Sequence, residues 1–543
     1  MRKLKKAAAL LLSFLLLLGS VGCGSVTSDD DNIPTSTGGH DLVRAAEADD
    51  VFSLNCNMNY SFNPLIATNH SNQLVCGLVY ENMVELDNNF EVIPNVITEW
   101  SYTDDGKSWT FTLDTTHTFH DGTQVLGKDL RYSLERSIYA DRYSGRFSSI
   151  QGVSYSDDTL VVTLGVGDTD FVKLLNIPII QAGSYDDDYP MGSGPYMYNE
   201  DYTELLPYEG YFTDSEPPVD VVYLKQYSDA EAIISAFEDG LIDLVINDPS
   251  SYTNLGYASS NEIHTFATTN MHYVMMNTES GICKDSTFRY AMNYAFDRSY
   301  LVTLLNGNAV ASAVPMYPTC SYYPTQLNNS LSYNLDTCRI VLENAGVRDY
   351  DDDGKMEYMN AATPVELTFA LCSDSSAKAG VVNRFADDMA SLGIDVTVEE
   401  LTWTEYKTAL LKGEFDLYYG EIKLRNNFDL TSLLEVHDEE DDPQEDEDGN
   451  VDVTHLQLMS NLNFSRNKDT LPMDYLRNYL STGALEKKSA AKSLYEFLTS
   501  NGYLITIGFE QQQIISHRGA IKGMDANIGN PLWNFADWTI NIG

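Results

Sequence analysis

Basic residues are scarce in this sequence. Its 33 Lys and Arg stand against 80 Asp and Glu, which gives a formal net charge of −47. A protein that binds nucleic acid needs a basic surface for the phosphate backbone, so this composition excludes nucleic acid as a partner. The same charge repels anionic lipid head groups, so we expect the folded part of the chain to stay off a membrane surface.

Catalytic motifs are lacking as well. The sequence has no H-E-x-x-H and no C-x-x-C motif, and Gly192-Ser193-Gly194 does not have the G-x-S-x-G spacing of a nucleophile elbow. His120 lies in a turn after a predicted strand, where we expect a hydrogen-bonded structural role rather than general-base catalysis. We therefore predict that the protein is not an enzyme and needs no cofactor. A secreted hydrolase is a remote alternative.

Apolar runs of membrane-spanning length are also missing. The run Ala7–Leu18 follows basic residues at the N-terminus and is shorter than the ~20 residues of a spanning helix. It leads to Ser20-Val21-Gly22-Cys23, which resembles the lipobox that ends a bacterial lipoprotein signal. We predict a signal peptide over 1–23 and a lipid anchor on Cys23. Ordinary secretion, with Cys23 removed or unmodified, is the alternative.

Two segments have the composition of unstructured chain. Residues 24–50 are rich in Ser, Thr, Asp and Gly, which predicts a flexible tether. Residues 438–452 are mostly acidic and include Pro443 and Gly449, which predicts a mobile surface loop. A basic partner for this loop is the alternative.

Cysteine is infrequent, and its spacing does not suggest a metal site. After Cys23, the sequence contains Cys56, Cys76, Cys283, Cys320, Cys338 and Cys372. An even number in an exported protein permits three disulfides, but buried free thiols are an equal alternative.

Residue alternation predicts a strand with one buried face around Trp109. Trp109, Phe111 and Leu113 point one way, and the residues between them are polar. Asp105-Gly106 and Asp121-Gly122 supply turns on either side.

The second half of the sequence alternates between helical and strand patterns. We predict a helix that Ser228 caps, one long helix over 285–305, and a helix from Asn334 that stops at Gly346. A helical stripe ends at Gly393, and a capping box of Thr402 with Glu405 starts the next helix. Strands beginning at Ile394 and Phe415 follow these helices, which indicates a parallel α/β layer.

This order of elements resembles the extracellular solute-binding proteins of family 5, the lipid-anchored peptide receptors of ABC importers. The matching elements are Leu78 to Asn82, Pro94, Trp100, the turn at Asp104 to Gly106, the strand Trp109 to Leu113, Phe119 to Thr123 (FHDGT), and the helix Asp129 to Ile138. Gly192 to Tyr196 is similar to the family's GTGPY turn, and Phe288 to Arg298 to one of its helices.

The resemblance implies an α/β fold of the type II periplasmic-binding-protein class. It would have two lobes, three domains, mixed sheets and two crossings between the lobes. Lobe one would contain domain I, formed by 51–71, 191–270 and 505–543, and an inserted domain II, formed by 72–190. Lobe two would be domain III, formed by 271–504.

The resemblance also implies candidate ligand-binding residues. In peptide receptors of this family, an Asp after a Gly-Trp pair binds the ammonium group of the peptide, because an unpaired buried ion costs several kcal/mol. Here Glu421 stands in place of the Trp, and Asp429 is the nearest downstream carboxylate, so the amine anchor is Glu421, Asp429 or missing. The other candidates are Asn63, Tyr273, Asn277, Trp403, Tyr419, Gly420 and Asn427, with core packing as the alternative role for the aromatic ones.

Asp349, Asp351 and Asp353 begin like a calcium-binding loop. The twelfth position is Asn360, not an acidic residue, so a full EF-hand is absent. A solvated turn is the default interpretation, and calcium binding by these three residues is the alternative.

From the resemblance we expect a monomeric receptor that captures a small solute, an oligopeptide first of all, for the permease and ATPase subunits of an ABC importer. Its lipid anchor would be its only membrane contact, on the outer face of a Gram-positive membrane rather than in a periplasm. A sugar or metal chelate as the ligand, or a role as a sensor, are the alternatives.

Overall fold

The computed structural model describes residues 51–143, 145–213, 217–247, 261–359, 361–436 and 462–541. The predicted signal peptide, Cys23, the tether and the acidic loop 438–452 lie outside these residues. Among the helices of the described chain, none is both long and apolar enough to cross a membrane.

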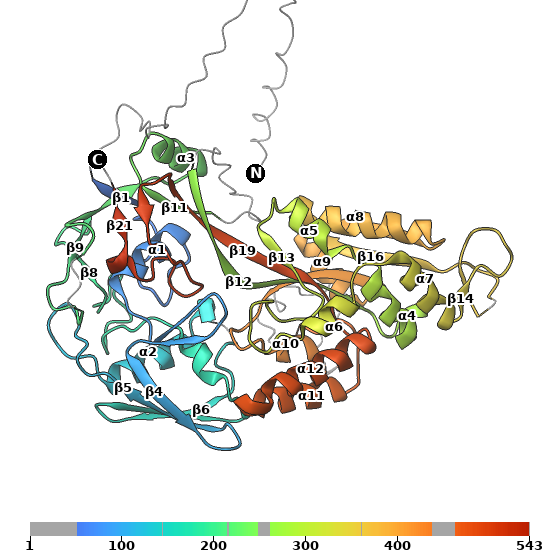
Figure 1. The fold of residues 1–543 in the computed structure, drawn as a ribbon, viewed down its shortest axis with the longest axis horizontal. Helices are drawn as coiled ribbons and strands as arrows, with labels where there is room; N and C mark the ends of the chain where they lie inside the picture. The colour runs from blue at the N-terminus through green and yellow to red at the C-terminus, as the bar shows by residue number, and fades with distance from the viewer. Residues whose placement is uncertain are drawn as a thin grey trace, which may run out of the picture. The chain divides into compact units, whose positions relative to one another are not determined.

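The largest sheet has 11 strands and mixed directions. In spatial order its strands are β17 (Asp395–Leu401), β16 (Glu366–Cys372), β18 (Leu417–Lys423), β12 (Asn261–Met276), β19 (Ile505–His517), β11 (Leu244–Asn247), β1 (Phe52–Cys56), β10 (Val222–Gln226), β9 (Glu204–Pro207) and β8 (Tyr196–Tyr198), and β13 (Ala309–Ala311) pairs with β19. Figure 1 shows β12 and β19 as long neighbouring strands that connect the elements around β1 and β11 with those around β16 and β18. Their pairing shifts register between Ala267 and Met271 and between His272 and Tyr273.

The parallel α/β layer is confirmed. β16 pairs in parallel with both β17 and β18. α8 (Ser376–Ser391) connects β16 to β17, and α9 (Trp403–Lys412) connects β17 to β18. Thr402 and Glu405 form the expected capping box at the start of α9. Gly393 and Gly413 end the two helices with φ of 89° and 70°, a backbone region that glycine adopts without a Cβ clash.

The strand around Trp109 is also confirmed. β5 (Ser108–Leu113) lies in an antiparallel sheet of order β4-β5-β7-β6, with β4 (Ile97–Tyr102), β7 (Thr159–Leu164) and β6 (Ile150–Tyr155). Trp109 and Phe111 are fully buried, and the Trp109 Nε1 donates to the carbonyl of Asp168 at 3.0 Å. The residues between them on β5 are exposed or half-buried.

The predicted long helix over 285–305 is wrong, because the chain breaks it into α4 (Ser286–Ala291), a short 3₁₀ turn over Met292–Tyr294, and α5 (Arg298–Leu304). The buried Arg298 guanidinium explains the break. It donates to the carbonyls of Asn293, Leu331 and Thr506 at 2.7–3.0 Å, and these bonds fix the start of α5 to distant parts of the chain. The predicted Ser228 cap is wrong as well: Asp229 caps α3 (Ala230–Glu238) by accepting from the Ala232 amide.

The remaining elements surround these sheets. The helices are α1 (His70–Val79), α2 (Gly127–Ser137), α6 (Thr325–Ser330), α7 (Leu335–Asn344), α10 (Thr431–Leu434), α11 (Leu471–Ser481) and α12 (Ala484–Ser500), and the short strand pairs are β2 (Val84–Leu86) with β3 (Val92–Pro94), β14 (Val347–Arg348) with β15 (Glu357–Tyr358), and β20 (Ile521–Lys522) with β21 (Thr539–Ile540). α7 begins after Asn334 as expected, and Gly346 follows its end.

Two structural details bear on the site. Phe90, in the turn between β2 and β3, is fully buried against Phe428 and Tyr317, with ring centroids 5.0 and 5.5 Å away. This contact packs the β2–β3 turn against the chain that follows β18. All six cysteines of the described residues are buried free thiols, and burial raises the pKa of Cys76 and Cys338 to about 12.

Candidate ligand-binding site

A cavity of about 140 Å³ lies beside the C-terminal end of β18. Arg142 and Arg146 line it from the segment after α2, and Lys423 and Arg425 line it from the end of β18 and the loop beyond. Among the described residues that line this cavity, none is Asp or Glu. In a chain with 80 acidic residues, the cavity is therefore a local concentration of positive charge.

Buried Tyr143 organises the two arginines. It belongs to a 3₁₀ turn over Asp141–Tyr143, and the guanidinium carbons of Arg142 and Arg146 lie 5.6 and 5.5 Å from the centre of its ring. Both distances are within the range of cation–π attraction. The Arg142 Nη1 also donates to the carbonyl of Pro64 at 2.8 Å. These contacts hold Arg142 and Arg146 together at the cavity wall.

Arg146 has fewer hydrogen bonds than a buried guanidinium can make. Its Nη2 donates to the carbonyl of Asn176 at 3.3 Å, but within the described structure its buried Nε has no hydrogen-bond acceptor. Burial lowers the pKa of Arg146 to about 10, and the positive charges of Arg142 and Arg425 act in the same direction, while Tyr143 opposes them. A planar anion in the cavity would offset this cost.

The backbone of β18 and its extension position Lys423. Lys423 pairs with Asn270 of β12, and the next amide, that of Leu424, donates to the carbonyl of Thr269 at 3.0 Å. Loss of hydration, together with the charges of Arg142 and Arg146, lowers the pKa of Lys423 to about 8. Solvent still reaches the exposed side chain, so part of this repulsion is screened.

Arg425 differs from the other three basic residues because it has a carboxylate partner. It forms an ion pair with Asp429, and its Nη2 donates to Ser148 Oγ at 3.2 Å. Arg142, Arg146 and Lys423 have no carboxylate within ion-pair distance in the described structure.

The segment before the C-terminus completes the wall with Gly529 and Asn530. A Cβ on Gly529 would lie 1.8 Å from the Asn176 side-chain amide, so a larger residue there would displace Asn176 from the cavity wall. The Asn530 Nδ2 donates to the carbonyl of Gly77 in α1 at 2.9 Å. Stretches that are distant in sequence thus meet around one small space.

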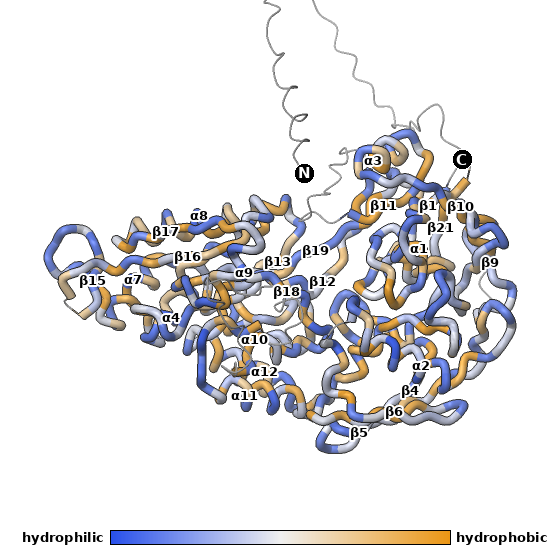
Figure 2. Tube along the Cα trace, turned by 180° about the vertical axis from the view of Figure 1, so that it is seen from behind, coloured by the Kyte–Doolittle hydropathy of each residue, from blue (hydrophilic) through white to orange (hydrophobic). Residues whose placement is uncertain are grey.

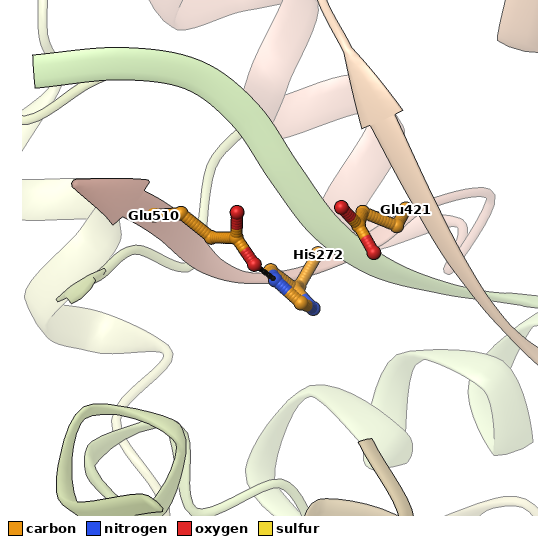
Figure 3. A group of neighbouring side chains, drawn as sticks. All are labelled: His272, Glu421 and Glu510. Carbon is orange, nitrogen blue, oxygen red and sulfur yellow. Dashed lines mark hydrogen bonds and ion pairs between the residues drawn. The ribbon is translucent and has the colours of Figure 1, made fainter. Parts of the chain in front are cut away.

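A second polar group lies where β12, β18 and β19 meet (Figure 3). His272 Nε2 lies 2.7 Å from Glu510, and His272 Nδ1 lies 3.0 Å from the Tyr419 hydroxyl. Both ring nitrogens therefore have partners, although the residues form a group of metal-ligating type with Glu421. Glu421 also pairs with Lys378 at 2.6 Å, so each of the three residues already has a partner within the protein.

Comparison with known proteins identifies the family. The model of the bacterial extracellular solute-binding proteins, family 5, matches residues 91–435. The chain belongs to this family. Proteins of this family are extracytoplasmic substrate-binding proteins of ABC transporters, and the chain is one of them.

Similar proteins support the family and the fold of this solute-binding protein. A putative ABC transporter peptide-binding protein of Brucella ovis is 24% identical over 413 residues, which cover 69% of this chain and 73% of that protein. AppA of Bacillus subtilis, solved with a nonapeptide, aligns with a TM-score of 0.58 and 17% identity over 90% of this chain and 98% of its own. NikZ of Campylobacter jejuni, solved with Ni(L-His), aligns with a TM-score of 0.61 and 18% identity over 90% and 99%. The periplasmic-binding-protein-like α/β fold is confirmed.

The predicted residues around Glu421 pack among themselves in this solute-binding protein. Tyr273 is 4% exposed, and its ring lies against Gly420, where an added Cβ would come within 2.2 Å of the Tyr273 Cζ. Tyr419 is buried, and its hydroxyl forms a hydrogen bond with His272 Nδ1. Glu421 is exposed and forms the ion pair with Lys378.

The predicted polar residues make internal bonds. The side-chain amides donate as follows: Asn63 to the Tyr185 carbonyl at 2.7 Å, Asn277 to the Gly413 carbonyl at 3.1 Å, and Asn427 to the Asp168 carboxylate at 2.8 Å. Asp429 accepts from Arg425 and from the amide and hydroxyl of Thr431. Trp403 is 53% exposed, with the Lys407 ammonium 5.4 Å from its ring centre.

None of these nine predicted residues lines the cavity, although neighbours in sequence such as Pro64 and Lys423 do. Their role in ligand binding stays a prediction. Arg142 and Arg146 were missed by sequence reasoning. A signal was available, because Arg131, Arg136, Arg142 and Arg146 follow one another closely in a chain that is poor in basic residues.

Two other candidates can be placed. His120 is confirmed as a hydrogen-bonded turn residue, with Nε2 3.0 Å from the Gly194 carbonyl and a pKa that burial lowers to about 4. Asp349, Asp351 and Asp353 gather in the exposed turn between β14 and β15, a hydrophilic stretch in Figure 2. Their carboxylates accept backbone amides of the same turn, and calcium binding there stays a prediction.

Proposed function

We propose that this protein captures a small solute, in the first place an oligopeptide, and delivers it to the permease and ATPase subunits of an ABC importer. Membership of the solute-binding family supports the transport role. The peptide assignment is supported by the similarity to the Brucella protein and, through the fold, to AppA.

The capture step would use the two lobes expected from the sequence. In that division Arg142 belongs to the inserted domain 72–190, Lys423 to lobe two at 271–504, and Gly529 to the C-terminal part of domain I. The observation that carries the proposal is that all three line one cavity. A solute bound there would touch both lobes and would favour the arrangement in which they are closed.

Attachment would follow the sequence prediction. Cleavage before Cys23 and lipidation of its thiol would hold a monomeric receptor at the outer face of a Gram-positive membrane, with residues 24–50 as the tether. Palmitate labelling of the expressed full-length chain, lost in Cys23→Ala, tests this part independently of the ligand.

A metal chelate is the second candidate ligand. NikZ was solved with Ni(L-His), and a chelate held together by carboxylates would also suit a basic wall. A neutral sugar carries no negative charge that could pair with the basic residues of the cavity, so the cavity favours a sugar less than a peptide or a chelate.

Mass spectrometry of small molecules released from the natively purified protein tests the proposal. We expect peptides at a stoichiometry near one, and the same peptides should raise the melting temperature of the emptied protein by mass action. Release of a metal chelate would favour the second candidate. Hydrolysis of an added peptide, or a melting temperature that no peptide changes, would contradict the proposal.

A further inference from the structure

The basic cavity raises a question that the peptide proposal leaves open, because three of its positive charges have no negative partner among the residues that the structure describes. Like charges held together destabilise a fold unless something compensates them. Proteins keep such an arrangement where an anion binds, because charge-assisted hydrogen bonds from guanidinium and ammonium groups then replace the repulsion. The closeness of Arg142, Arg146 and Lys423 therefore indicates that they bind a negatively charged group of a ligand and do not have a purely structural role.

The size of the cavity limits what occupies it. At about 140 Å³ it is smaller than the ~300–1,000 Å³ of sites that enclose a whole drug-sized ligand. It is large enough for roughly four or five water molecules, or one end group of a longer solute. The cavity is thus a subsite for a single group.

The donors around it suit a planar anion. Arg142 and Arg146 offer forked guanidinium groups, and Lys423 adds a compact charge from the end of β18. Asn82, Asn176 and Asn530 add side-chain amides to the lining. The Arg146 Nε, buried and without an acceptor in the described structure, is a donor that such an anion would satisfy.

Arg425 and Glu85, which lies next to Asn82, determine which other charges act on an anion in the cavity. Arg425 is already neutralised by Asp429, so it contributes shape more than charge. Behind the amide wall, Glu85 accepts from Asn82 at 2.9 Å, and burial raises its pKa to about 8, which keeps it largely neutral at pH 7. No ionised carboxylate of the described cavity wall competes with an incoming anion.

We propose that Arg142, Arg146 and Lys423 form a carboxylate-binding subsite, so that this receptor selects solutes with a free carboxylate, such as acidic peptides. This inference rests on the proposed function and specifies the ligand class that it leaves open. It places the carboxyl end of the solute beside the end of β18.

The test is calorimetric titration of the emptied protein with tri-glutamate, tri-glutamate amide, tri-alanine, citrate and inorganic phosphate. We expect tri-glutamate to bind more tightly than tri-alanine, because its side-chain carboxylates add to the attraction of the basic wall. Its C-terminal amide should bind less tightly than the free acid, because it lacks the carboxyl end that the subsite holds. Arg142→Gln, Arg146→Gln and Lys423→Gln should each weaken tri-glutamate binding by about tenfold or more, the loss of one charged hydrogen bond. Lys128→Gln, an exposed site on α2, is the matched control and should change nothing.

The outcomes separate this subsite from the proposed function. Equal affinity for the acid and the amide, unchanged in the three variants, would overturn the subsite and leave peptide capture standing. Binding of citrate but no peptide, lost in the variants, would support the subsite and contradict the peptide assignment. Phosphate binding without citrate or tri-glutamate binding would overturn the carboxylate assignment, and failure of every probe to bind would overturn the subsite. Circular dichroism of each variant excludes misfolding as the cause of a loss.

Discussion

Lys487 and Lys423 are two cations with opposite surroundings. Lys487 of α12 is buried, and its Nζ lies 3.1 Å from the Asp170 carboxylate and 3.0 Å from the Thr169 hydroxyl. Lys423 has two arginines nearby and, in the described structure, no carboxylate partner. The first charge is satisfied by the protein itself and has a structural role. The charge of Lys423 is available to an anion of a ligand, which is the property expected of a binding residue.

The largest effect predicted from this comparison is on stability. Lys487→Met should lower the free energy of unfolding by roughly 3–5 kcal/mol, because it leaves the Asp170 charge buried without its partner. Urea denaturation followed by circular dichroism measures this loss. The control is Lys488→Met, a neighbouring exposed position on the same helix, which should change stability by less than about 0.5 kcal/mol.

A double variant sharpens this prediction. Adding Asp170→Asn to Lys487→Met removes the orphaned charge, so part of the lost stability should return. If Lys487→Met lowers the free energy of unfolding no more than Lys488→Met does, the ion pair of Lys487 does not stabilise the fold. Lys487 and Lys423 would then not differ in the way proposed.

The next effect is the pH dependence of anion binding. A bound carboxylate favours charged Lys423 and raises its pKa above the value of about 8 in the empty cavity. Affinity for tri-glutamate should therefore be constant below pH 7 and fall by up to about tenfold as pH rises above 8, where the empty protein has lost this proton. Calorimetry between pH 6 and 10 measures the fall.

Other groups near the cavity must be separated from Lys423 in this experiment. Arg142 and Arg146 line the same cavity as Lys423 and their charges act on it, and Arg425 is paired with Asp429. Glu85 ionises near the same pH because burial raises its pKa to about 8, and its new negative charge would also weaken anion binding. Lys423→Gln should remove most of the pH dependence, and Glu85→Gln only a smaller part. A profile that Lys423→Gln leaves unchanged would assign the effect to Glu85.

The sequence predicted elements whose formation depends on local patterns. The β5 strand follows from the alternation around Trp109, and the start of α9 follows from the Thr402–Glu405 capping box. These features need only neighbouring residues. The break between α4 and α5 was not predictable in this way, because the Arg298 guanidinium bonds the distant carbonyls of Leu331 and Thr506.

The site shows the same limit. The resemblance directed attention to the segment after Gly420, and Lys423 at its end lines the cavity. It could not show that Asp429 is engaged by Arg425 and Thr431, or that the Tyr273 ring occupies the space beside Gly420. Arg142 and Lys423 are about 280 positions apart in the printed sequence, and only the folded chain brings them together.

The smallest effect concerns a third lysine, in an intermediate situation. Lys355 lies 2.6 Å from Asp395, but the two side chains are 40% and 54% exposed. Water screens this pair and both side chains lose rotamer freedom in forming it, so Lys355→Met should cost less than about 1 kcal/mol by urea denaturation. The loss should shrink further in 1 M NaCl, where the screening length falls to about 3 Å, whereas the loss caused by Lys487→Met should persist because salt does not reach a buried pair. The contrary result is that Lys355→Met lowers the free energy of unfolding as much as Lys487→Met does. In that case, the presence of a carboxylate partner, and not burial, would distinguish Lys487 and Lys355 from Lys423, which has no carboxylate partner in the described structure.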